Sequence, residues 1–177
     1  MKKLLFSLFT FVALSFCVSS CDDDDDDDDG VGEFTLEGET YDLDKAFAGL
    51  EEETPVGDNT YYTWHIAVVS DDITWNESSK EFSGTGDGIG FWIMVANDAE
   101  FLPEGTYEYV METADSDGVY IDYNFTNETG EVYDDLENVS LRITKSGNTF
   151  TFEFTLLLAN EEVVTGQFTG LVTEVTV

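Results

Sequence analysis

Apolar and polar side chains alternate along most of the chain after residue 32. Between residues 61 and 68, the apolar side chains of Tyr62, Trp64, Ile66 and Val68 occupy every second position. The same period recurs at Ile89, Phe91, Ile93 and Val95, at Val119, Ile121, Tyr123 and Phe125, at Val139, Leu141 and Ile143, and at Phe150, Phe152, Phe154, Leu156 and Leu158. Successive side chains of a strand point to opposite faces, so this period predicts strands with one buried face.

Short polar stretches between these runs predict turns. Gly38 and the segment Ser146-Gly147-Asn148 are each placed to close a tight hairpin, because Gly and Asn tolerate positive φ. Residues 102–105 and 159–162 are predicted to be further connections. A helical turn is predicted only within 44–53, from the spacing of Ala46, Phe47 and Leu50.

About nine short strands, separated by turns, predict an all-β domain with antiparallel sheets. The first choice is a β-sandwich of the jelly-roll or immunoglobulin-like kind, and the alternative is a small lipocalin-like β-barrel. Residues 33–177 show no linker and no fixed repeat, and their length suits one domain.

The N-terminus has the pattern of an export signal. Lys2 and Lys3 precede an apolar run over residues 4–18, shorter than the about 20 residues of a membrane-spanning helix, so residues 1–20 are predicted to be a signal peptide. The following Val18-Ser19-Ser20-Cys21 resembles the lipobox of bacterial lipoproteins, which implies acylation of Cys21. Ordinary secretion with an unmodified Cys21 is the alternative. The other cysteine, Cys17, would be removed, so the mature chain cannot form an internal disulfide.

An unbroken acidic run follows this cysteine, and residues 21–32 are expected to form a disordered tether because like charges repel and bury nothing. The run consists of Asp22, Asp23, Asp24, Asp25, Asp26, Asp27, Asp28 and Asp29. It resembles the export signal of Bacteroidota surface lipoproteins, which implies an outer-membrane lipid anchor with the domain on the extracellular side.

Two motifs carry a wider resemblance. Near the start of the predicted domain, the segment 33–43 has the form FTLxGxxYxL, and near its end the segment 164–170 contains GxFxG. Gly105-Thr106-Tyr107 lies between them. This set resembles small, uncharacterised surface lipoproteins of Bacteroidota. The resemblance implies an address and an all-β fold, but no particular activity.

Charge limits the partners that the domain can have. The chain carries a formal net charge of −33, and outside the predicted signal peptide its cations are Lys45, Lys80, Arg142 and Lys145. Affinity for nucleic acids comes largely from Lys and Arg, so nucleic-acid binding is excluded. Neutral ligands such as glycans, cations and protein partners at the cell surface are compatible with this charge.

Catalytic signals are weak. His65 is the only histidine, the chain has no G-x-S-x-G motif, and one histidine with one acylated cysteine cannot supply a usual zinc ligand set. We interpret His65 as an ordinary strand residue. Chance carboxylate pairs are abundant, so a hydrolase is the minority hypothesis. We expect a protein that is not an enzyme and that needs no cofactor.

Calcium is the one metal that the sequence favours at all. Asp115, Asp117 and Asp122 place hard oxygen ligands around a turn, but the EF-hand spacing and its terminal Glu are missing. A solvated acidic turn is the preferred interpretation.

Glycines and aromatic residues suggest a binding surface. Gly84, Gly86, Gly88 and Gly90 would share one strand face with Trp92 and Met94 if the strand began early enough. They would then form a bare backbone shelf that a flat ligand can approach closely, although a flexible loop entering a strand is the simpler interpretation. Trp75 in a polar loop and Tyr120 are further candidate platforms, whereas Trp64 is expected in the core.

Two classes of function follow from these observations. The first is a non-catalytic binding module for a glycan or another neutral ligand, which uses Trp75, Trp92 and Tyr120. The second is a structural, adhesive or accessory subunit that engages protein partners through a sheet edge or face.

Overall fold

The computed structural model describes residues 30–96, 101–110, 120–126, 132–133 and 136–177, and among these only residues outside 109–136 have described side chains. The strands are β1 (Val31–Leu36), β2 (Glu39–Leu43), β3 (Lys45–Val56), β4 (Asn59–Val69), β5 (Thr74–Asn76), β6 (Glu81–Ser83), β7 (Gly88–Ala96), β8 (Gly105–Val110), β9 (Tyr120–Thr126), β10 (Val132–Tyr133), β11 (Leu136–Ser146), β12 (Thr149–Leu158), β13 (Val163–Gly170) and β14 (Val172–Glu174). The predicted all-β class is confirmed. The predicted signal peptide, Cys21 and the aspartate run lie outside the described residues.

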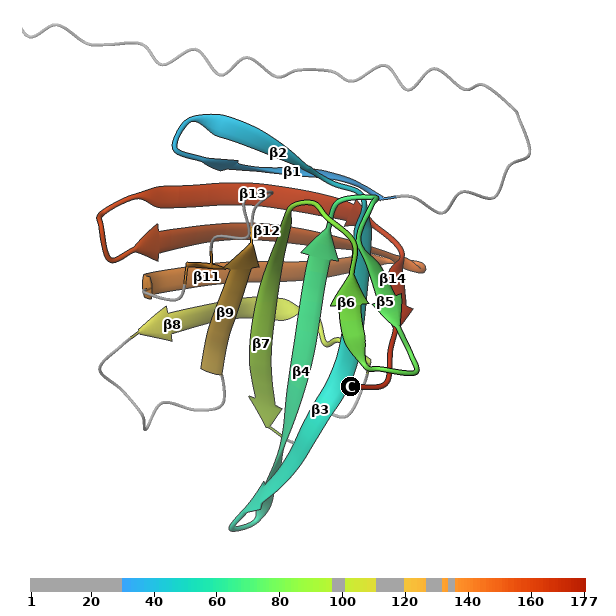
Figure 1. Cartoon of the computed structure of the whole chain (residues 1–177). Coiled ribbons are helices and arrows are strands. Elements are labelled where there is room, and N and C mark those ends of the chain that lie inside the picture. Colours follow the sequence, from blue (N-terminus) through green and yellow to red (C-terminus); the bar gives the residue numbers. More distant parts are fainter. Residues whose placement is uncertain (1–29, 97–100, 111–119, 127–131, 134–135) are drawn as a thin grey trace, which may run out of the picture.

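Two six-stranded sheets and one separate hairpin make up the described structure. Sheet A has the order β2-β1-β13-β12-β11-β8, and sheet B has the order β10-β9-β7-β4-β3-β14. All neighbours pair antiparallel except β14, which runs parallel to β3. In Figure 1 the strands of sheet A cross those of sheet B at a steep angle. Neither sheet closes on itself within the described ranges, so the lipocalin-like barrel is wrong for this part of the chain.

One hydrophobic core contains the inward side chains of both sheets. Phe91 of β7 and Phe154 of β12 meet there with ring centroids 5.4 Å apart. The predicted core faces of 62–68, 89–95, 139–143 and 150–158 all contribute to this cluster. The alternation found these positions because each strand has one face toward the core and one toward water.

The predicted hairpin turns are confirmed. Glu37 and Gly38 both have positive φ, 52° and 82°, which matches the right-handed twist of the strands that they join. Gly147 has φ 65° between β11 and β12. Residues 102–105 and 159–162 also connect strands. Strand β1 begins at Val31, two residues earlier than the predicted domain boundary, because Gly32 already pairs with Phe168 of β13.

The helical turn predicted within 44–53 is wrong, since these residues belong to β3. Both faces of β3 are covered: Ala46 and Ala48 lie in the core between the sheets, while Phe47 on the other face packs against Phe82. A bulge between Leu50 and Glu52 then shifts the register against β4. Continuous apolar residues followed by a bulge erase the two-residue period and leave a spacing that resembles a helix.

In the part of the chain with a described backbone, no helix has the length and apolar character needed to cross a membrane.

Candidate functional site

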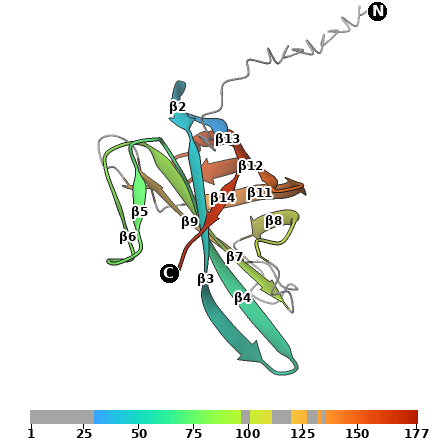
Figure 2. The ribbon, with the colours of Figure 1, turned by 90° about the vertical axis from the view of Figure 1, so that its right-hand side faces the viewer.

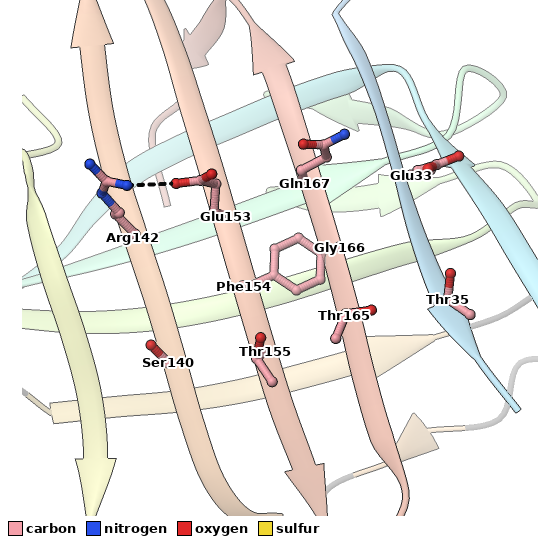
Figure 3. A pocket seen from close by; sticks show the side chains of 10 residues that line it. All are labelled: Glu33, Thr35, Ser140, Arg142, Glu153, Phe154, Thr155, Thr165, Gly166 and Gln167. Carbon is pink, nitrogen blue, oxygen red and sulfur yellow. Dashed lines mark hydrogen bonds and ion pairs between the residues drawn. The ribbon is translucent and has the colours of Figure 1, made fainter. Parts of the chain in front are cut away.

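A hollow with a volume of about 420 Å³ lies on the outer face of sheet A. Strand register aligns its side chains in two rows across β1, β13, β12 and β11 (Figure 3). One row is Glu33, Gln167, Glu153 and Arg142, and the other is Thr35, Thr165, Thr155 and Ser140. We call this depression the sheet A hollow.

The sheet A hollow is open and polar. Its one ion pair joins Arg142 Nη1 to Glu153 Oε2 at 3.1 Å, and both side chains are more than half exposed. Such a pair contributes at most about 1 kcal/mol. The depression forms because one row consists of short hydroxyl side chains and the row beside it of longer side chains. Nothing in this arrangement excludes water from it. This face offers hydrogen bonds to a polar ligand but little apolar contact.

The second hollow, of about 290 Å³, lies on the outer face of sheet B and is mainly apolar. Its floor is the backbone of Gly88 and Gly90 in β7, with Ala67 of β4 opposite Gly90. Both glycines are buried, and an added Cβ at Gly88 would stand 3.0 Å from Val69 Cγ1 and 3.3 Å from the Val68 carbonyl oxygen, so a side chain there would crowd β4. We call this hollow the shelf cleft.

A stacked pair of rings forms one end of the shelf cleft. His65 of β4 and Trp92 of β7 are register partners, and their rings lie parallel at 2° with centroids 4.4 Å apart. Both side chains are half-buried. Burial lowers the pKa of His65 below its ordinary value of 6.5, although the negative charge of Glu51 acts in the opposite direction. The imidazole is therefore neutral at pH 7 and has one donor and one acceptor nitrogen.

The β5–β6 hairpin forms the other end of the shelf cleft. It lies on the side of sheet B that faces away from sheet A (Figure 2). Phe82 of β6 packs edge-on against Phe47 of β3 at 5.5 Å, and buried Ile73 packs against Ala67. Because a two-stranded hairpin is marginally stable alone, these apolar contacts are what hold it against the sheet.

The four glycines divide into two pairs, which corrects the prediction of one continuous shelf. Gly88 and Gly90 share the face of Trp92, as expected, but β7 begins only at Gly88. Gly84 has φ 121°, and an added Cβ there would lie 2.0 Å from the Asp72 carbonyl oxygen. A Cβ on Gly86 would lie 2.0 Å from Ser70 Oγ. Because Gly84 and Gly86 have no side chain, the segment between β6 and β7 can pass close to residues 70–73.

The three aromatic residues predicted to be binding platforms do not lie together in one site. Trp92 lines the shelf cleft, and its ligand-binding role stays a prediction. Trp75 is not on a loop: it lies in β5, pairs with Phe82 at a centroid distance of 4.9 Å, and stands behind the cleft wall. Trp64 is buried in the core, as predicted. Tyr120 is the register partner of Met94 at the start of β9, but its side chain lies outside the description.

The candidate calcium ligands were not tested. Asp115 and Asp117 lie outside the described residues, and Asp122 is described only as the backbone partner of Trp92 in β9. Among the residues whose side chains are described, no group of three or more His, Cys, Asp or Glu side chains is arranged to hold a metal ion.

His65, Ala67 and Phe82 are among the residues of the shelf cleft that sequence reasoning missed. His65 and Ala67 had a usable signal, because their alternation with Trp64, Ile66 and Val68 puts them on the outer face of β4. Phe82 had none, since its contact with Phe47 joins segments that are distant in sequence.

Comparisons with protein-family models, with curated proteins and with solved structures found no match for this chain.

The pKa of His65 gives a prediction for stability against pH. Because the folded pKa is lowered, the unfolded chain binds this proton more readily, and stability falls as pH drops below 6.5 toward the folded pKa. We expect the wild type to lose stability relative to His65→Gln between pH 7 and pH 5 in thermal unfolding. Comparing the two proteins cancels the titration of the shared carboxylates. A difference that stays constant with pH would show that His65 is not desolvated.

Proposed function

We propose that this chain is a surface-anchored bacterial lipoprotein whose domain is a non-catalytic binding module for a neutral ligand. The predicted signal peptide, the lipid on Cys21 and the aspartate run would place the domain outside the outer membrane. The shelf cleft would bind a ligand, such as a sugar ring or another neutral compound, through a flat apolar face.

The domain that carries this cleft is, in the same proposal, a β-sandwich of the jelly-roll or immunoglobulin-like kind. Support comes from the single core shared by two open six-stranded sheets. Inward side chains of both sheets fill that core, which leaves the outer face of sheet B available for binding.

The observation that carries the proposal is the mainly apolar hollow beside Trp92. Gly88 and Gly90 add no side chain to its floor, and the half-buried indole of Trp92 provides apolar contact area next to them. A neutral ligand also suits the charge of −33, since an anion would be repelled from the whole domain.

Thermal unfolding in the presence of candidate ligands tests the binding function. The protein is the chain without residues 1–20 and with Cys21→Ser, and the panel contains neutral oligosaccharides and neutral ring compounds. A ligand at 100 times its dissociation constant adds about 2.7 kcal/mol of stability, which raises the midpoint by several degrees. Gly90→Val fills the floor of the cleft and should abolish the shift. Thr155→Val, in the sheet A hollow, should keep it.

Three outcomes count against the cleft. A flat response across the panel contradicts a binding module of this kind. A shift that survives Gly90→Val but disappears in Thr155→Val would move the site to the sheet A hollow. A shift that survives both variants would place the site elsewhere in the chain.

A second candidate, a protein-interaction subunit, is favoured by one feature. The β3–β4 hairpin projects beyond both sheets (Figures 1 and 2), and Val56 near its tip is 56% exposed. Strand β14 covers the edge of β3 from Ala46 to Ala48, and Val175 continues beside it as far as Gly49. Within the described structure, the edge beyond Gly49 offers backbone groups to an added strand. Cross-linking on intact cells from a Val56→Cys variant would identify such a partner.

A further inference from the structure

We infer that the open edge of β3 between Leu50 and Pro55 is a docking site for an extended, lysine- or arginine-rich segment of another protein. This inference rests on the second candidate function, the protein-interaction subunit, and names the chemistry of its partner. It does not depend on the shelf cleft. Three features carry it: the edge is uncovered, it belongs to a projecting hairpin, and its exposed side chains are acidic.

The edge is uncovered because the segment that follows β14 turns away from it. The Val175 N–H donates to the Ala48 carbonyl oxygen at 2.9 Å, so this segment still lies beside β3 there. Two residues later, Lys80 Nζ donates to the backbone oxygen of Val177 at 2.9 Å. Lys80 lies between β5 and β6, so the bond directs the segment toward that hairpin. The described neighbours of β3 in sheet B are β4 and β14, and both views show the end of the β3–β4 hairpin standing apart (Figures 1 and 2).

The strand register shows which backbone groups face the open edge. A two-residue turn joins Val56 to Asn59, and such turns close on a hydrogen-bonded pair. Bonded and open positions then alternate, so Thr54 bonds to β4 while Glu53 and Pro55 direct their backbone groups outward. Glu53 offers an N–H and a C=O, whereas Pro55 offers only a C=O. An added strand can therefore bond to Glu53 and must end near Pro55.

The β3–β4 hairpin extends further than the core requires. Strand β3 has 12 residues, about twice the usual length of a strand, and its buried residues end at Gly49. Ordering the exposed residues beyond that point costs conformational entropy with little apolar burial in return. A partner strand that pairs with the edge would supply additional burial and main-chain hydrogen bonds.

The side chains along the edge favour a cationic partner. Glu51, Glu52 and Glu53 are all exposed. Glu52 lies opposite Thr63 on the outer face of sheet B, and Glu53 lies opposite Tyr62 on the other face, so carboxylates flank the edge on both sides. Within the described structure, no ion pair joins them to a lysine or arginine. Cross-strand pairs of opposite charge stabilise a sheet, and like charges directly opposite destabilise it.

A second copy of this chain is disfavoured as the occupant. Pairing two β3 edges would place the glutamates of one copy against those of the other, and each chain carries a net charge of −33. The bulge between Leu50 and Glu52 and the proline at position 55 act in the same direction, because bulges and edge prolines hinder pairing between like edges. The edge is therefore protected against its own copies and remains available to a cationic strand.

Four acetylated and amidated heptapeptides test the inference in titrations of the ¹⁵N-labelled protein, followed by nuclear magnetic resonance at about 0.15 M salt. They are cationic TKVKVKT, neutral TQVQVQT, anionic TEVEVET, and TKPKPKT, whose prolines prevent strand pairing at equal charge. The protein is again the Cys21→Ser chain without residues 1–20. We expect TKVKVKT to bind with a dissociation constant on the order of 1 mM or lower, and the others at least about tenfold more weakly. The aspartate run attracts TKVKVKT and TKPKPKT equally, so it cannot produce this difference.

Matched variants separate the edge from the general charge of the chain. TKVKVKT binding should weaken about tenfold in a triple variant with Glu51→Gln, Glu52→Gln and Glu53→Gln. A control triple variant with Glu33→Gln, Glu77→Gln and Glu161→Gln has the same net charge and changes three carboxylates that are exposed elsewhere. Its binding should change by less than about twofold. All six positions are exposed, so both variants should fold, which circular dichroism will show.

Amide hydrogen exchange tests the predicted pairing directly. Bound TKVKVKT should slow the exchange of the Glu53 N–H, which faces the open edge. The Thr54 N–H already bonds to β4 and should keep its rate. An unchanged rate at Glu53 under saturating peptide would contradict strand addition at this edge.

The remaining outcomes separate the inference from the interaction function. Equal binding of TKVKVKT and TKPKPKT, or equal losses in the two triple variants, would show only general attraction to an acidic chain and overturn the inference. Binding of TQVQVQT or TEVEVET as tight as that of TKVKVKT would overturn the charge of the partner. If no peptide binds but Val56→Cys still cross-links a partner on intact cells, the cationic strand is overturned and the interaction function stands. If neither occurs, both are overturned.

Discussion

Replacing Phe152 with alanine should lower the free energy of unfolding by about 3–5 kcal/mol, a large part of the stability of one domain. The Phe152 ring is fully buried in the core between the sheets. It stacks on Phe150 at 6.3 Å and on Phe168 at 6.0 Å, so its loss leaves a cavity that two rings border. Denaturant unfolding of the two proteins measures the difference.

Glu153→Ala is the matched control for this change. Glu153 is the next residue of β12, points outward and is exposed, and its ion pair with Arg142 lies at the surface. Its loss should change stability by no more than about 1 kcal/mol. Equal effects of the two substitutions would mean that the inward and outward faces of β12 are wrongly assigned.

Replacing Cys21 with serine should abolish lipid attachment and release the protein from membranes. For this test, residues 1–20 of the serine variant are exchanged for a signal peptide of ordinary secretion so that it is still exported, and the native protein is the comparison. Each acyl methylene buried in a bilayer contributes about 0.8 kcal/mol, so two or more chains hold a protein firmly and their loss frees it. Detergent phase partition and the mass of the N-terminal peptide measure the effect.

The native protein should partition into the detergent phase, with an N-terminal peptide that begins at an acylated Cys21. A native protein that begins at an unmodified Cys21 and stays in the aqueous phase would support ordinary secretion. It would also remove the basis for placing the domain on the cell surface by a lipid anchor.

The strands that the sequence pattern predicted share one physical property. In β12 one face packs in the core and the other lies at the surface, so alternation marks the inward side chains directly. In β7 the large apolar side chains of the core face alternate with Gly88, Gly90 and Trp92 on the outer face. Strand β3 lacks this property because the β5–β6 hairpin covers its outer face at Phe47. Its pattern therefore predicted a helical turn where the structure has a strand.

Pairings between distant strands had no local signal. Strand β1 pairs with β13, and β14 adds in parallel to β3, although more than a hundred residues separate the partners in each case. The shelf cleft depends on such contacts. Alternation indicated that Gly88, Gly90 and Trp92 share a face, but the wall at Phe82 exists only because the hairpin folds back onto Phe47.

His65 shows what composition alone leaves open. A single histidine without a serine nucleophile or a metal ligand set has no catalytic signature, and the residue was interpreted as an ordinary strand histidine. The structure agrees that it lies in a strand, but places it on the outer face, stacked on Trp92 at one end of the cleft. Its candidate role is to recognise a ligand, which requires no partner motif in the sequence.

The most direct test of the shelf cleft is a titration of the ¹⁵N-labelled protein with 2-naphthol, one of the neutral ring compounds in the thermal panel, followed through the indole N–H signals in a nuclear magnetic resonance spectrum. The chain has three tryptophans, Trp64, Trp75 and Trp92, so single Trp→Phe variants suffice to assign the signals. The signal of Trp92 should move progressively and saturate, while that of Trp64, buried in the core, should stay in place. Saturable binding that leaves the Trp92 signal unmoved would contradict the cleft as the binding site.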